Sequence, residues 1–104
     1  MKFKKFYGKR VVEPESLAKF YLELSMIESI IEVDGIEAIT YGVQINKLDP
    51  EGGKILEIET ICDITPDKPA IEKVARKLFD SEVEPVILHE IVSDYVDSLE
   101  YLSV

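Results

Sequence analysis

Cysteine and histidine are nearly absent from this sequence, which has one of each, and tryptophan is missing altogether. Because Cys62 has no second thiol with which to form an internal disulfide, nothing in the composition suggests an oxidising compartment. A zinc site requires several Cys or His side chains at short spacings, whereas Cys62 and His89 lie 27 positions apart. We therefore expect no metal site and no cofactor.

Long apolar runs are also lacking. The longest extend over only a few residues, far short of the ~20 that are needed to span a membrane. The opening stretch MKFKKFYGKR has the charge of a signal-peptide n-region, but the apolar run that should follow it is missing. We expect a cytoplasmic protein that makes no contact with a membrane.

Basic residues are scarce outside the first ten positions. Those ten hold five bases and no acid, whereas the other 94 residues carry 21 acids against 7 bases. A surface this negative repels nucleic-acid phosphates over a Debye length of about 8 Å at physiological salt. Direct binding of nucleic acid is thus not expected. A protein partner, in particular a basic one, is the better electrostatic match.

The chain has 104 residues, which fits a single domain comprising residues 1–104. A chain of this size buries only about 60–65% of its unfolded surface. We therefore do not expect a deep active-site cavity, and a homodimer is one way to cover more apolar surface.

Two regions have the alternation and composition of β-strands. Residues 1–12 mix aromatic and β-branched side chains with lysines, which is typical of an edge strand. Residues 36–64 predict a hairpin, because two alternating segments are joined by the turn-forming stretch LDPEGGK. The expected inward faces are Ile39, Tyr41, Val43 and Ile45 in the first of these strands and Leu56, Ile58, Thr60, Cys62 and Ile64 in the second.

Residues 17–33 fit two structures. As a helix, the segment has an apolar stripe that only Glu28 interrupts; as a strand, its alternation slips by one residue after Met26, as a β-bulge would cause. The dipeptide Asp34-Gly35 is a strong two-residue hairpin turn. That turn favours a strand, paired with residues 36–47.

The C-terminal part has the periodicity of two amphipathic helices. The stretch TPDKP provides an N-cap, Thr65 or Asp67, with prolines that the first turn tolerates, and Pro85 begins the second helix. Strands followed by helices predict an α+β fold, an antiparallel sheet of three to four strands with both helices packed on one face. The apolar stripes are Ile71, Val74, Ala75, Leu78 and Phe79 in the first helix and Leu88, Ile91, Val92, Tyr95 and Leu99 in the second.

His89, Ser93 and Asp97 recur every four residues along the second helix and are the residue types of a hydrolase triad. A triad needs the histidine between the serine and the acid, but here His89 and Asp97 would lie about 12 Å apart along the helix axis. Cys62 has acidic neighbours, which do not activate a thiolate, and it is predicted to be a small buried side chain. We predict no catalytic residue and a protein that is not an enzyme.

One face of the second helix is acidic. It holds Glu90, Asp94, Asp97 and Glu100, a pattern that is most often a solvated surface. The functional alternative is a docking surface for a basic protein, in which the carboxylates imitate DNA phosphates. These four residues are the candidate interaction residues.

Three stretches in the C-terminal half carry a family resemblance: YGVQI at residues 41–45, the pattern DIT.D from Asp63 to Asp67, and VEPVILHEIVSDYV at residues 83–96. The order and spacing of these stretches resemble those of an uncharacterised family of short proteins of unknown function, found mostly in anaerobic Gram-positive bacteria. The resemblance implies a strand-like early segment, which supports a strand at residues 17–33. It implies no known activity and no catalytic residues.

Three functions remain open on this basis. The first is a non-enzymatic interaction or regulatory protein that acts through surface contacts, and the second narrows it to an acidic inhibitor of a nucleic-acid-binding protein. The third is a small-molecule-binding domain with a pocket between sheet and helices, which Tyr41, Tyr95 and His89 would line.

Overall fold

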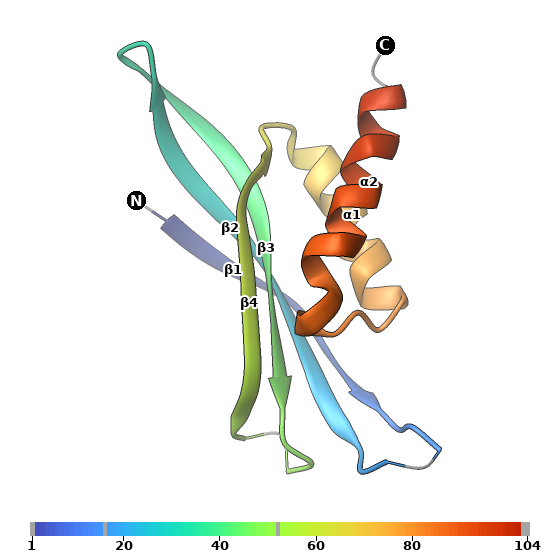
Figure 1. The fold of residues 1–104 in the computed structure, drawn as a ribbon. Coiled ribbons are helices and arrows are strands. Elements are labelled where there is room, and N and C mark those ends of the chain that lie inside the picture. Colours follow the sequence, from blue (N-terminus) through green and yellow to red (C-terminus); the bar gives the residue numbers. More distant parts are fainter. Residues whose placement is uncertain (1, 16, 52, 103–104) are drawn as a thin grey trace.

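The computed structural model describes residues 2–15, 17–51 and 53–102, except for the side chains of residues 98–102. Four antiparallel strands form one sheet in the order β1-β2-β3-β4, and two helices lie on one of its faces (Figure 1). The predicted α+β fold is confirmed. Its elements are β1 (Lys2–Val12), β2 (Phe20–Val33), β3 (Ile36–Leu48), β4 (Ile55–Thr65), α1 (Lys68–Asp80), the 3-10 turn η1 (Pro85–Ile87) and α2 (Leu88–Leu102).

The ambiguous segment is a strand from Phe20 to Val33, because β2 pairs with β3 in an unbroken register from Tyr21–Leu48 to Val33–Ile36. Asp34 and Gly35 connect the two strands with φ angles of 51° and 78°. Positive φ at both central residues defines a type I′ turn, whose twist matches that of the flanking strands. The expected two-residue hairpin is confirmed.

The bulge that the slipped alternation predicted in β2 is not there. The extra residue is instead Tyr7 of β1, between the pairs Phe6–Ser25 and Gly8–Leu24. The slip in β2 has a different cause: Leu22 and Leu24 are buried against the helices, whereas Ser25 and Ile27 are buried on the opposite face. A central strand is flanked on both sides, so residues on both of its faces can be buried. We call the face of Ser25, Ile27 and Ser29 the open face, because no helix covers it.

The hydrophobic core lies between β2, β3 and the two helices. Both predicted helical stripes are confirmed for the described side chains, and only Leu99 of α2 lies outside them. Each fully buried aliphatic side chain contributes roughly 1.5–3 kcal/mol through removal from water. The best-buried members are Val43, Ile45, Ile71, Leu78 and Leu88.

The inward face predicted for β4 is wrong in its first half. Leu56 and Ile58 are half exposed, while Ile61, which falls out of phase with them, packs against the core. The alternation is reset where Cys62, Asp63 and Ile64 together oppose the single residue Gly42. Cys62 lies in this bulge and is half-buried rather than fully buried.

Two local features hold the β4 bulge in place. Asp63 has a left-handed backbone with φ 55°, and its carboxylate accepts a 2.7 Å hydrogen bond from Thr40 Oγ1. Opposite it, a Cβ on Gly42 would overlap the carbonyl oxygen of Ile61 and lie 2.8 Å from Cys62 Cα. Position 42 therefore has room only for glycine.

The N-terminus of α1 differs in detail from the prediction. Asp67 occupies the N-cap position, but its side chain makes no cap hydrogen bond. Thr65 Oγ1 instead accepts a hydrogen bond of 3.1 Å from the backbone N–H of Asp67. The approach to α1 is therefore fixed by a side chain two residues before the cap, and no carboxylate caps the free N–H groups of the first turn.

The end of the β2–β3 hairpin projects beyond the rest of the sheet (Figure 1). β1 begins opposite Ser29 and β4 ends opposite Tyr41, so residues 30–39 form a two-stranded arm. The radius of gyration is 14.7 Å, above the ~13 Å of a compact domain of this length.

Candidate functional site

The three residues with triad chemistry are not brought together. His89 is exposed, with 67% of its side chain accessible, and its Nε2 lies 3.2 Å from Glu59 Oε1 of β4. The acid beside the imidazole is thus Glu59, 30 positions away in the chain, and not Asp97. Sequence periodicity could not find this contact, because it depends on how α2 crosses β4.

The acidic face of α2 is solvent-exposed in the part that the structure describes. Glu90, Asp94 and Asp97 are exposed, and the side chain of Glu100 lies outside the described residues. A cation from α1 lies against the same helix, since Lys77 Nζ is 5.2 Å from the centre of the Tyr95 ring. This cation lies beside Tyr95 and not on the acidic face itself, and the role of that face as a docking surface stays a prediction.

Among residues 2–15, 17–51 and 53–102, no three His, Cys, Asp or Glu side chains lie close enough together to hold a metal ion. Nor does that part of the chain contain a helix both long and apolar enough to cross the bilayer.

The first half of β4 is an exposed sheet edge. Ile55, Leu56 and Ile58 have exposed fractions of 51%, 50% and 53%. Glu57 and Glu59 alternate with Leu56 and Ile58. An edge strand presents unpaired N–H and C=O groups, which another extended chain can pair with. We call residues 55–60 the β4 edge; it is apolar and acidic and holds no base.

The other edge of the sheet, β1, has the opposite charge. It holds five bases and no acid, and lysines on an edge strand discourage pairing with a second strand. Its lysines are also divided between the two faces: Lys4 lies opposite Ile27 on the open face, whereas Lys5 lies opposite Met26 on the helix-covered face.

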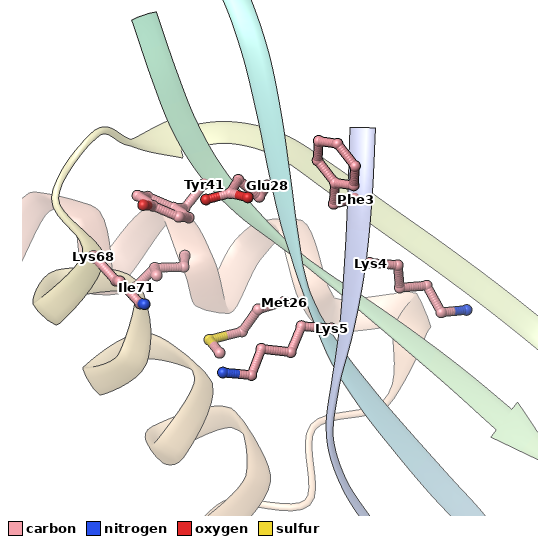
Figure 2. Close-up of a pocket in the computed structure, with 8 residues that line it drawn as sticks. All are labelled: Phe3, Lys4, Lys5, Met26, Glu28, Tyr41, Lys68 and Ile71. Carbon is pink, nitrogen blue, oxygen red and sulfur yellow. The ribbon is translucent and has the colours of Figure 1, made fainter. Parts of the chain in front are cut away.

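A pocket of about 160 Å³ opens between β1, the adjoining parts of β2 and β3, and the first turn of α1 (Figure 2). Its floor is apolar: Met26 is half-buried, Ile71 of α1 is buried, and the half-buried Tyr41 ring closes one end. Of the residues predicted to line a pocket between sheet and helices, Tyr41 does so here, whereas Tyr95 and His89 do not.

The rim of this pocket is mostly cationic. Lys5 reaches in from β1 and Lys68 from α1, and Glu28 of β2 is the one carboxylate (Figure 2). Lys4 also borders the pocket, but its side chain points away from it. α1 has no acidic residue in its first turn, so its positive N-terminal dipole adds to the potential of the two lysines. Sequence analysis missed Lys5 and Lys68 as a pair, because 63 positions separate them.

A wider groove of about 590 Å³ lies between the loop after β1 and the start of β4. One of its cations, Lys47, is already occupied by an ion pair of 2.9 Å with Glu84 and a longer one of 3.6 Å with Glu57. The hydrogen bond to Glu84 raises the pKa of Lys47, and burial opposes it only in part. That ammonium group serves the fold and is not available to a ligand.

Comparison with known proteins gives a family. The model of a family of unknown function, DUF6514, matches residues 3–98. The chain belongs to this family. The match confirms the resemblance to an uncharacterised family and extends it over the sheet as well as the helices. No curated protein and no solved structure matches the chain.

Proposed function

We propose that the protein is a non-enzymatic interaction protein, which binds an extended, basic segment of another protein along the β4 edge. The observation that carries this proposal is that Ile55, Leu56 and Ile58 are half exposed on a strand that has a neighbouring strand on one side only. Strand addition gives affinity through main-chain hydrogen bonds and specificity through alternate side chains. The cytoplasm, where a free thiol such as Cys62 stays reduced, is the proposed location.

Charge supports a basic partner. Glu57 and Glu59 alternate with the apolar side chains of the β4 edge, and opposite charges across a strand pair contribute about 0.2–1 kcal/mol each. Like charges placed opposite each other are destabilising, so an acidic strand would be rejected. The β1 edge lacks this combination, since its own lysines repel a basic segment.

A short synthetic peptide of alternating lysine and valine tests the proposal, with the glutamate–valine peptide as its counterpart. We expect fluorescence anisotropy to show binding of the lysine peptide only, weakening as salt screens the charges. Hydrogen exchange should slow at backbone amides within residues 55–60.

Two matched variants locate the contact. Ile58→Lys places a base on the β4 edge and should weaken peptide binding at least about tenfold, equivalent to ~1.4 kcal/mol. Ile36→Lys makes the same change on the arm, at a side chain that is 71% exposed, and should leave binding unchanged. Equal binding of both peptides, or a loss confined to Ile36→Lys, would show that the β4 edge is not the binding surface.

A further inference from the structure

We propose that the pocket between β1 and the first turn of α1 binds a small carboxylate with a compact apolar body, of the size of an aromatic ring. This inference goes beyond the proposed function, because it concerns a small ligand and a different part of the molecule. It is carried by the combination of an apolar floor, two ammonium groups at the rim and a defined volume.

The volume sets the size of the ligand. The pocket encloses about 160 Å³, and an apolar protein cavity of about 150 Å³ is large enough for benzene. Met26, Ile71 and Tyr41 offer thioether, aliphatic and aromatic contacts to such a body. A flat ring or a branched short chain therefore fits, and a nucleotide does not.

The residues at the rim of the pocket determine the charge that a ligand should carry. Some bases elsewhere in the protein are paired with carboxylates: Arg10 with Glu82, and Lys47 with Glu84. Among the described residues, no carboxylate forms an ion pair with Lys5 or Lys68. In a chain with a net charge of −9, two ammonium groups that have no ion-pair partner among those residues and face one hollow raise the positive potential at that place.

The carboxylate of Glu28 favours a ligand with a single negative charge over a dianion. Its half-buried carboxylate borders the same pocket, so the local formal charge of the inward-facing groups is about one positive unit, not two. A dianion such as phosphate would be repelled by Glu28 and would also gain nothing from the apolar floor. A monocarboxylate places its charge between the lysines and its ring on Met26 and Ile71.

Four small probes separate the contributions. Benzoate carries the ring and the negative charge, benzamide is its neutral counterpart, benzamidine is the cation, and inorganic phosphate is an anion without an apolar body. Two-dimensional ¹H–¹⁵N NMR titrations should show saturable shifts with benzoate at Lys5, Met26 and Ile71, with a Kd of about 1 mM or below for so small a ligand. Benzamide should bind at least about fivefold more weakly, and neither benzamidine nor phosphate should produce these shifts.

The chain offers two test variants and a matched control. Lys5→Gln and Lys68→Gln should each weaken benzoate binding about three- to tenfold and leave the weaker benzamide affinity unchanged. Lys4→Gln removes the same charge one residue away, where the side chain points out of the pocket, and should leave benzoate affinity unaltered. All three lysines are exposed, so the variants should fold, which circular dichroism verifies.

Each contrary result overturns the proposal. Equal affinities for benzoate and benzamide would remove the role of the lysines, and tighter binding of benzamidine would assign the pocket to cations through Glu28. An equal loss in Lys4→Gln and Lys5→Gln would mean that only the overall charge of β1 acts. Absence of saturable shifts with every probe would show that the hollow is not a binding site. None of these outcomes depends on the β4 edge.

Discussion

Replacing Gly42 with alanine should destabilise the fold more than any other glycine-to-alanine change that the structure allows us to compare. The added Cβ would overlap the carbonyl oxygen of Ile61 and lie 2.8 Å from Cys62 Cα. Both contacts are with backbone of the β4 bulge, so no side chain can rotate away to relieve them. Overpacking typically costs about 1–3 kcal/mol, and we expect ~3 kcal/mol because β4 itself must move.

Thermal unfolding followed by circular dichroism measures the effect. A loss of ~3 kcal/mol corresponds to a fall in Tm of roughly 12–24 °C for a domain of this size. The control is Gly53→Ala, since a Cβ there would meet nothing within 4 Å, and its stability should stay within about 0.5 kcal/mol of the wild type. If the Tm of Gly42→Ala lies within about 3 °C of the wild-type Tm, β4 does not approach Gly42 as closely as the structure shows, and the reasoning is refuted.

Three further changes test other parts of the structure. Leu88→Ala should cost about 2–5 kcal/mol in urea unfolding, because Leu88 is 0% exposed and its removal leaves a core cavity. His89→Ala should change stability by less than about 0.5 kcal/mol, since the imidazole is mostly in solvent and its partner Glu59 is only half-buried; a larger loss would mean that the pair is structural. Because Glu84 raises the folded-state pKa of Lys47 above its ordinary 10.5, the ion pair stabilises the fold below that pH and is lost as pH rises through the raised pKa. The stability gap between wild type and Lys47→Gln should therefore hold from about pH 7 to pH 9 and narrow above 10.5; a gap that grows with pH would contradict this assignment.

The elements of the fold could be predicted because their signals are local. Apolar residues repeat at helical spacing in α1 and α2, and Asp34-Gly35 dictates the hairpin between β2 and β3 with two positive φ angles. The irregularities could not be predicted in the same way. The Tyr7 bulge and the β4 bulge opposite Gly42 depend on the neighbouring strand, and a strand's own alternation does not contain its partner's register.

The candidate sites show the same division between local and distant information. The acidic face of α2 is visible in the sequence because Glu90, Asp94 and Asp97 share one helical face. The pocket is not visible, because β1, β2, β3 and α1 each contribute to it. Lys5 and Lys68 border one pocket only because the fold places the start of β1 beside the first turn of α1.

The lysines at the start of the chain contribute to two different surfaces of the sheet. Neighbouring residues of a strand point to opposite faces, so Lys4 lies on the open face and Lys5 lies beside Met26 on the helix-covered face. Lysines on the open face and along β1 oppose pairing with another strand, which is why the β4 edge is the one that we propose for partner binding. Lys5 instead faces Lys68 across an apolar floor. Charge substitutions at positions 4 and 5 should therefore have separable effects, the first on self-association through β1 and the second on ligand binding.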